Sequence, residues 1–361
     1  MTILAKDIIK RIKNFFEVKH CKDRWRTYKS KIKLYLNENP HGTSKNVRYA
    51  IIKKTLRGLN RYPEAEEDEL NKLIEKKYEV EHENILLTNG TDEAIRFIAQ
   101  TFLRYRDEVI IPIPTFSRYE EVSKIHGAKI IDVKLKNFSV DIQGILNSIT
   151  DKTRIIWIAN PNNPTGKLLN KEEVCYFLDR VPQNILVVYD GAYSEFSDDK
   201  NRINNICHIF KRYNNVLILK TFSKFYGMAA LRIGYIIGDI RLISIINKNR
   251  GPYSINTLSL VGAINAIQDS KFIGKIYDEN IKGKHFIYRE FDKLDIFYLH
   301  TQANYILFRI KDKNAFDVYQ DLCRKGILIS IFENKYLRVS VGTKKENDKF
   351  IKIIKEITTK N

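Results

Sequence analysis

Lys220-Thr-Phe-Ser-Lys-Phe-Tyr-Gly-Met-Ala-Ala-Leu-Arg-Ile-Gly-Tyr235 follows a short apolar run, residues 216–219, that is typical of a buried strand. The stretch places Lys224 beside small hydroxyl residues in an apolar, glycine-containing context. Burial lowers the pKa of a lysine, which suits an amine that attacks an aldehyde to form a Schiff base. The alternative is a lysine at a strand end whose ammonium group reaches water. Arg232, with Thr221 and Ser223, would suit a phosphate nearby.

This stretch is part of a repeated pattern of strand, loop and helix. Short apolar runs predict seven strands, at residues 85–87, 109–113, 129–133, 154–159, 185–189, 216–219 and 233–237. Helix-length amphipathic segments separate most of them, which predicts an α/β fold with a mainly parallel seven-stranded sheet between helices. We expect this large domain to span residues 38–250.

The rest of the chain predicts a smaller α+β domain formed by residues 1–37 and 251–361. It should contain helices over 258–267 and 271–294, strands over 304–310, 327–332 and 337–341, and a final helix. Residues 3–16 have the pattern of a basic amphipathic helix, which more often docks on the protein body than on a membrane.

The composition is that of a globular protein, with 43% hydrophobic residues in 361. No apolar run approaches the roughly 18–20 residues that cross a bilayer, and residues 1–16 lack the features of a secretory signal. The cysteines form no CxxC pair and have no histidine at metal spacing; they are Cys21, Cys175, Cys207 and Cys323. We therefore expect a reduced, cytoplasmic protein without a metal site.

The net charge of +19 is spread along the whole chain, with its densest stretch at residues 19–33. No zinc-finger spacing and no aromatic RNA-binding signature accompany it. We therefore expect small-molecule partners, with a field that favours phosphorylated substrates, and neither nucleic acid nor membrane as a partner.

Polar residues follow five of the predicted strands directly. In chain order they are Gly90, Thr91 and Asp92, then Phe116, then Asn163, then Asp190 and Tyr193, then Thr221, Ser223 and Lys224. Ligands of open α/β sheets bind beyond the carboxyl ends of the strands. The pattern therefore predicts one ligand site at this edge.

Each of these residues has a chemical interpretation and a plainer alternative. The helix that begins at Gly90 offers free N–H groups to a phosphate, although an ordinary helix cap has the same sequence. Asp190 ends an apolar strand and needs a cationic or protonated partner, for which a pyridinium nitrogen is suitable; the alternative is an aspartate that caps a loop. Asn163 and Tyr193 could reach an oxygen on such a ring, or be a turn residue and a core tyrosine. Phe116 would stack on the ring, or belong to the core.

Arg338 lies inside a predicted strand, where arginine is uncommon unless it pairs with an anion. The functional interpretation is a bidentate interaction with a substrate carboxylate. An internal salt bridge is the alternative.

These motifs resemble the class I/II, fold-type I pyridoxal-phosphate aminotransferases, in particular the histidinol-phosphate aminotransferase branch. The resemblance runs from about residue 34 to the end. It is carried in order by Asn37-Glu-Asn-Pro, Arg61-Tyr-Pro-Glu, Gly90-Thr-Asp-Glu-Ala, Pro161-Asn-Asn-Pro-Thr-Gly166, Asp190-Gly-Ala-Tyr193, Thr221-Phe-Ser-Lys224 with Arg232, and Leu337-Arg-Val-Ser-Val-Gly-Thr343.

The resemblance implies pyridoxal 5'-phosphate as cofactor and Lys224, Asp190 and Tyr193 as catalytic residues. Lys224 would bind the cofactor covalently and Asp190 would pair with its ring nitrogen. Phe116, Asn163 and Tyr193 would contact the ring, and Gly90, Thr91, Asp92, Thr221, Ser223 and Arg232 would hold the phosphate. Arg338, Asn163 and Asn39 would bind substrate. Tyr62 would reach the cofactor phosphate of a neighbouring subunit, which implies a homodimer with shared active sites.

Two positions depart from the pattern of that branch. Gly191 stands where an acidic residue is usual, and Ser330 stands near the place of a common arginine. An aromatic substrate residue near the N-terminus has a counterpart only if Trp25 or Tyr28 serves. The same branch contains decarboxylases of O-phospho-amino acids. The expected activity is amino transfer to a 2-oxo acid such as 2-oxoglutarate, and the alternative is decarboxylation of phosphothreonine or phosphoserine.

Overall fold

The computed structural model describes residues 31–198 and 212–359. The predicted helix over 3–16, most of the basic stretch 19–33, Trp25 and Tyr28 lie outside the described residues.

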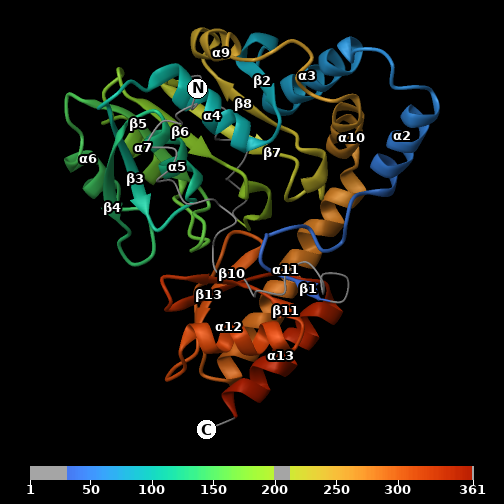
Figure 1. The fold of residues 1–361 in the computed structure, drawn as a ribbon, viewed down its shortest axis with the longest axis vertical. Helices are drawn as coiled ribbons and strands as arrows, with labels where there is room; N and C mark the ends of the chain where they lie inside the picture. Colours follow the sequence, from blue (N-terminus) through green and yellow to red (C-terminus); the bar gives the residue numbers. More distant parts are fainter. Residues whose placement is uncertain (1–30, 199–211, 360–361) are drawn as a thin grey trace, which may run out of the picture.

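A seven-stranded sheet forms the centre of the larger lobe (Figure 1). Its strands are β2 (Ile85–Thr88), β3 (Glu108–Ile113), β4 (Lys129–Lys134), β5 (Thr153–Ala159), β6 (Leu186–Asp190), β7 (Val216–Thr221) and β8 (Gly234–Gly238). They lie in the order β2-β8-β7-β6-β5-β3-β4. Neighbours are parallel except for the two pairs that β8 makes with β2 and β7. The predicted α/β fold with a mainly parallel sheet is confirmed.

The sheet is buried on both faces, which explains why its strands are continuous apolar runs. Val216 and Ile218 belong to the core on one face, and Leu217 and Leu219 belong to the core on the other. The core on the face of Val216 and Ile218 is covered by α2 (Lys45–Leu56), α3 (Glu64–Tyr78), α6 (Ile142–Asn147), α7 (Lys171–Leu178) and α10 (Thr257–Gln268). The core on the face of Leu217 and Leu219 is covered by α4 (Thr91–Phe102), α5 (Arg118–Ile125) and α9 (Ile240–Asn247).

A smaller lobe is built around an antiparallel sheet, β12-β13-β10-β9 (Figure 1). Its strands are β9 (Phe297–Tyr298), β10 (Tyr305–Arg309), β12 (Ser330–Phe332) and β13 (Tyr336–Ser340), and its helices are α11 (Ser270–Lys293), α12 (Ala315–Arg324) and α13 (Lys344–Thr358). Leu34 is buried in this core, and β1 (Ile32–Lys33) pairs in parallel with β11 (Ile327–Leu328). Residues 32–34 therefore belong to the smaller lobe.

The expectation of one strand over 327–332 is wrong. The chain pairs with β1 as far as Leu328 and then changes to the four-stranded sheet as β12. Ser330 is the first residue of β12, and its hydroxyl donates to the carbonyl of Tyr35 (3.0 Å).

The long helix α11 connects the two lobes. Leu260 and Ala263 of the preceding α10 are buried in the larger core, whereas Ile287 and Phe291 of α11 are buried in the smaller one. We therefore propose that the boundary between the two units lies within α11 rather than near residue 250. No helix in the described ranges is long and apolar enough to cross a membrane.

Candidate active site

A cavity of about 130 Å³ lies at the carboxyl edge of the large sheet. The strands β3, β5, β6 and β7 are parallel, so the loops that follow them meet at this edge. The cavity is lined by Thr91, Asp92, Phe116, Tyr119, Ala159, Asn163, Asp190, Ala192, Tyr193, Thr221, Ser223, Lys224, Ala229 and Arg232. The structure thus brings together most of the site residues predicted from the sequence.

Asp190 is the buried carboxylate of this cavity. Its Oδ2 accepts a hydrogen bond from the Tyr119 hydroxyl (2.7 Å), and its Oδ1 accepts one from the N–H of Ala192 (3.0 Å). Burial raises the pKa of Asp190, and the hydrogen bond from Tyr119 opposes that rise. The Tyr119 ring is held in turn by Trp157, on which it stacks with centroids 5.1 Å apart. The carboxylate therefore has a fixed orientation.

Lys224 supplies the amine. Its Nζ donates to the carbonyl of Leu36 (2.7 Å), on the N-terminal segment. Burial is the main cause that lowers the pKa of Lys224 to about 8, and the positive charge of Arg338 lowers it further. Near physiological pH the neutral amine, which is the form that attacks a carbonyl, is therefore a minor fraction but a far larger one than for an ordinary lysine.

The N-terminus of α4 and the loop after β7 form the cationic end of the cavity. Arg232 donates to the Ser223 hydroxyl (3.2 Å) and lies 3.5 Å from an oxygen of Asp92. Gly90 has a φ of +76°, and a Cβ there would come within 2.7 Å of Arg232 Nη2. Both this conformation and this lack of space therefore favour glycine at position 90. In the loop after β7, the Thr221 hydroxyl accepts from the N–H of Ser223 (3.0 Å). We call Thr91, Asp92, Asp190, Thr221, Ser223, Lys224 and Arg232 the strand-end group.

Tyr193, Asn163 and Phe116 line the sides of the cavity. The Tyr193 hydroxyl accepts from Asn37 Nδ2 (3.0 Å), and its ring meets Tyr305 edge-on at 5.0 Å. Phe116 meets Tyr119 edge-on at 5.6 Å. Aromatic rings and hydroxyls thus surround the space between Asp190 and Lys224.

Arg338 is buried behind Asn163, to whose Oδ1 it donates. It also donates to the carbonyl of Tyr35 (2.7 Å) and the hydroxyl of Ser330 (3.2 Å). Its Nε is buried without a hydrogen-bond partner, and no carboxylate pairs with it within residues 31–198 and 212–359. A buried guanidinium without an acidic partner is costly and suits the binding of an anion. We call Arg338, Asn163, Tyr35 and Ser330 the arginine group.

Besides Gly90 and Arg338, two further predicted residues do not line the cavity. Asn39 donates to the carbonyl of Phe225 (2.9 Å) and accepts from the N–H of His41 (2.9 Å), so both ends of its amide are engaged. Tyr62 is 75% exposed and stacks on Tyr253, with centroids 4.5 Å apart. Contacts of Asn39 with substrate and of Tyr62 with a neighbouring subunit remain predictions.

Sequence reasoning missed Tyr119 and Asn37 as residues of the site. Tyr119 comes three residues after Phe116, in the first turn of α5, and its N–H donates to the carbonyl of Phe116 (3.3 Å), so it could have been placed at the same edge from that spacing. Asn37 belongs to a motif that was recognised, but its contact with Tyr193 joins segments far apart in sequence. No local signal indicates such a contact.

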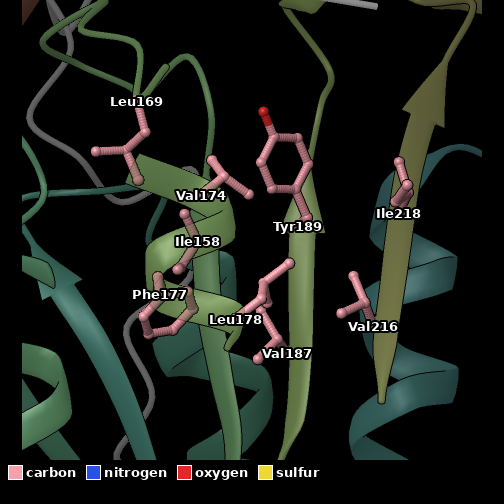
Figure 2. A pocket seen from close by; sticks show the side chains of 9 residues that line it. All are labelled: Ile158, Leu169, Val174, Phe177, Leu178, Val187, Tyr189, Val216 and Ile218. Carbon is pink, nitrogen blue, oxygen red and sulfur yellow. The ribbon is translucent and has the colours of Figure 1, made fainter. Parts of the chain in front are cut away.

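A second cavity, shown in Figure 2, lies under α7 on the face of the sheet opposite Asp190. Eight of its nine lining side chains are aliphatic or phenylalanine, and the ninth, Tyr189, has its hydroxyl bonded to Asn160 (2.5 Å). It offers no acid, base or nucleophile. Throughout the described ranges, no three His, Cys, Asp or Glu side chains gather at metal-binding distance.

Comparison with known proteins gives consistent results. The family described as aminotransferase class I and II matches residues 29–354. The histidinol-phosphate aminotransferase of Caldicellulosiruptor saccharolyticus is 38% identical over 330 residues, which cover 90% of this chain and 91% of that protein. The structure of the histidinol-phosphate aminotransferase from Clostridium acetobutylicum is 25% identical, with a TM-score of 0.84, and covers 91% of this chain and 100% of that one.

A further solved structure shares the fold. It is the histidinol-phosphate aminotransferase of Sinorhizobium meliloti in complex with pyridoxal-5'-phosphate, which is 22% identical with a TM-score of 0.84. The match covers 90% of this chain and 91% of that one.

Proposed function

This chain belongs to the class I and II aminotransferases, and we propose that it is a pyridoxal-phosphate-dependent enzyme of the histidinol-phosphate aminotransferase type. It would move an amino group between a small, phosphorylated amine or amino acid and a 2-oxo acid such as 2-oxoglutarate. The observation that carries this proposal is that the Lys224 amine and the buried Asp190 carboxylate line one cavity. The scattered cysteines support a cytoplasmic location.

The residues of the cavity fit the cofactor group by group. Asp190 suits the ring nitrogen, Asn163 and Tyr193 suit the ring hydroxyl, and Phe116 suits the flat face of the ring. The cationic end suits the phosphate, because the N-terminus of α4 and Arg232 meet there. Gly90 keeps that end open, since a side chain would displace the guanidinium.

Pyridoxal phosphate, when bound, supplies an aldehyde that reacts with amines and a ring that accepts electrons. Lys224 would provide the amine that holds it, and the lowered pKa of Lys224, about 8, raises the share of neutral, reactive amine above that of an ordinary lysine. Once substrate has replaced it, the free Nζ can take the proton from the substrate α-carbon.

Asp190 and Tyr193 act on the ring. The Asp190 carboxylate would accept a hydrogen bond from the ring nitrogen and favour its protonated form, because a buried carboxylate is stabilised by a positively charged partner. The Tyr193 hydroxyl, oriented by Asn37, can donate to the ring oxygen. Arg338 would bind the substrate carboxylate, which would satisfy its free Nε.

The exposed face of α2 supports a homodimer. Tyr49, Ile52 and Leu56 are 69%, 59% and 83% exposed, and Leu59 and Tyr62 beyond the helix are 50% and 75% exposed. So much apolar surface on one short segment is typical of an interaction site. A second copy of the chain would cover it and would bring Tyr62 to the partner's cofactor phosphate.

Two experiments test the homodimer: one places a charge on the exposed face of α2, and the other mixes two variants of the chain. Leu56→Glu should convert the dimer to monomer in sedimentation, whereas Ile245→Glu, on the exposed side of α9, should not. Mixing inactive Lys224→Ala with a Tyr62→Phe variant should form hybrids with an altered cofactor affinity. Dimers that persist in Leu56→Glu would contradict this surface.

The activity is tested on the purified holoprotein. Glutamate should remove the visible absorption band of the bound cofactor, and 2-oxoglutarate or the keto form of histidinol phosphate should restore it. Carbon dioxide released from phosphothreonine or phosphoserine without such cycling would favour the decarboxylase alternative. The histidinol-phosphate relatives favour amino transfer.

A further inference from the structure

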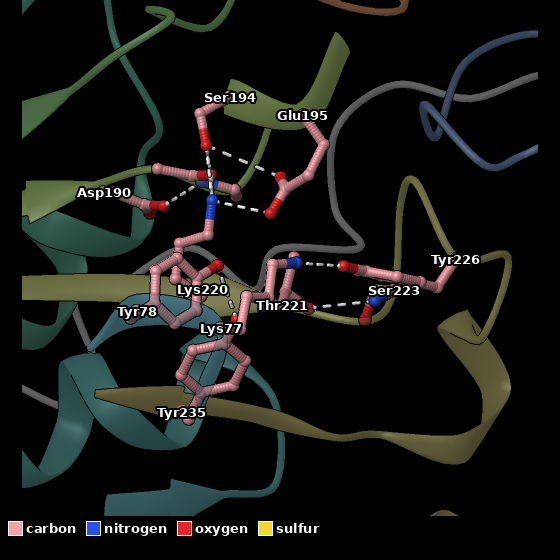
Figure 3. A network of polar contacts seen from close by, with 12 residues as sticks. Lys77, Tyr78, Asp190, Ser194, Glu195, Lys220, Thr221, Ser223, Tyr226 and Tyr235 are labelled. Carbon is pink, nitrogen blue, oxygen red and sulfur yellow. Dashed lines mark hydrogen bonds and ion pairs between the residues drawn. The ribbon is translucent and has the colours of Figure 1, made fainter. Parts of the chain in front are cut away.

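A lysine and a glutamate are buried together beside Asp190 (Figure 3). Lys220 is 4% exposed and Glu195 is 6% exposed, and Lys220 Nζ lies 2.6 Å from Glu195 Oε1. The same Nζ donates to the Ser194 hydroxyl (2.5 Å) and to the carbonyl of Gly191 (3.3 Å). The ammonium group therefore has two hydrogen-bond acceptors and one ion-pair partner.

Stability alone does not account for this pair. A buried ion pair loses hydration on both sides and is often no more stable than apolar residues of the same volume. Position 220 continues a strand whose residues Val216 to Leu219 are all apolar and buried, so an apolar side chain there would extend the core. The charged pair is therefore better explained by the two chain segments that it holds together.

The pair joins the two segments that carry the proposed catalytic residues. The turn after β6 carries Asp190 and Tyr193, and β7 leads directly into Lys224. Lys220 extends from β7 and contacts the turn at Gly191, Ser194 and Glu195.

The backbone adds a further contact, from the N–H of Gly191 to the carbonyl of Leu219 (3.0 Å). A Cβ on Gly191 would lie 3.3 Å from Ser194 Oγ and 3.4 Å from Lys220 Cδ. The glycine thus lets the turn approach the lysine closely.

We propose that Lys220, with Glu195 as its counter-ion, is a positioning residue that fixes the turn of Asp190 and Tyr193 against the strand that leads to Lys224. This inference rests on the proposed function, because it concerns how those three groups are held around the cofactor. Lys220 does not line the cavity, so it would act through the turn.

The charge of Lys220 has a second effect. It favours the ionised form of Asp190 and so opposes the rise in the pKa of Asp190 that burial causes. The other groups that act on this carboxylate are Tyr119 on α5 and the N–H of Ala192, which favour the ionised form, and Asp92 on α4, which disfavours it. Loss of the Lys220 charge should therefore move protonation of Asp190 to higher pH.

The experiment compares four variants of the holoprotein: Lys220→Met, Lys220→Arg, Glu195→Gln, and the double variant Lys220→Met/Glu195→Gln. The double variant removes both charges and leaves no buried ion unpaired, so it should fold even where a single variant does not. In it the cofactor dissociation constant should rise and the half-reaction with glutamate should slow, each by roughly tenfold to a hundredfold, as is typical for residues that orient directly acting groups. The KM for glutamate should stay within about twofold, because the arginine group is untouched.

The pH profile separates positioning from folding. In the double variant the acid limb of kcat should move to higher pH, whereas Lys220→Arg, which keeps the charge, should keep the limb at its original place. Glu290→Gln is the matched control, because Glu290 is a buried carboxylate paired with Lys293 and Lys355 in the smaller lobe. It should change thermal stability without changing cofactor affinity.

A double variant with wild-type cofactor affinity, half-reaction rate and acid limb would overturn the inference. If instead the wild-type protein does not react with glutamate, the proposed function fails, and the cofactor dissociation constants still report whether Lys220 positions the turn.

Discussion

The strand-end group lines the cavity and the arginine group reaches it through Asn163, but the two groups are assembled in different ways. The strand-end group comes from the large sheet and the first turn of α4, in loops set side by side by parallel strands. The arginine group joins β13, the loop after β5 and the N-terminal segment, and its bond from Arg338 to Tyr35 spans 303 positions of the chain. One group is therefore fixed by a single sheet, and the other depends on how the two lobes meet.

This difference predicts a division of labour. Changes in the strand-end group should alter cofactor binding and proton transfer, whereas changes in the arginine group should alter substrate affinity. Contacts across the cavity limit the division, because Lys224 donates to Leu36 on the N-terminal segment. The predictions below test how far the two groups are independent.

The largest effect is expected from Lys224→Ala. The half-reaction with glutamate should slow by about 10²–10⁴-fold from the loss of proton transfer alone. Borohydride treatment should attach the cofactor to the wild-type chain at residue 224 and leave the variant unlabelled, as peptide mass spectrometry would report. Lys248→Ala, an exposed lysine, is the control and should react as the wild type does. Label at another residue in the wild-type protein would refute the assignment.

Arg338→Gln should have the next largest effect, and on substrate rather than cofactor. Loss of a charged hydrogen-bond donor should raise the KM for glutamate roughly tenfold to a hundredfold, equivalent to about 1.5–3 kcal/mol. The visible spectrum of the bound cofactor should persist. Arg309→Gln, an exposed strand arginine of the same lobe, is the control and should leave KM unchanged.

The same variant measures the coupling between the two groups. The positive charge of Arg338 helps to lower the pKa of Lys224, so its removal should raise that pKa above about 8. The rate at which an amine-reactive reagent modifies Lys224 in the cofactor-free protein, followed against pH, gives this midpoint. An unchanged midpoint would mean that the two groups are electrostatically independent.

Tyr119→Phe should have a smaller effect, confined to the strand-end group. Tyr119 donates to the ionised Asp190, so its loss should raise the pKa of that carboxyl. The carboxylate then takes up its proton at a higher pH, and activity on the acid side should be lost at a higher pH than in the wild type. Near neutral pH the rate should fall by less than roughly tenfold. Tyr288→Phe, which alters a buried hydroxyl of the smaller lobe bonded to Thr301, should leave the pH profile unchanged.

The two groups also differ in how much the sequence revealed. All seven strands of the large sheet could be predicted, because a sheet buried on both faces needs continuous apolar runs, and Asp190 and Lys224 follow two of them directly. The break between β11 and β12 could not be predicted, since it is defined by the strands with which they pair, β1 and β13, which lie in other segments. The sequence likewise gives no sign that Ser330 contacts Arg338.

The smallest effect is expected from Asn39→Ala, which tests whether Asn39 belongs with the arginine group as a substrate-binding residue. The resemblance implies that Asn39 binds substrate, but its amide bonds to Phe225 and His41 and does not line the cavity. If its part is to hold the N-terminal segment against the loop of Lys224, Asn39→Ala should lower the free energy of unfolding by about 1–3 kcal/mol, for two lost hydrogen bonds. The KM for glutamate should then stay within about twofold. A rise in KM comparable to that of Arg338→Gln, with unchanged stability, would instead place Asn39 among the substrate-binding residues. A residue that contacts the substrate can change substrate affinity without changing the free energy of unfolding.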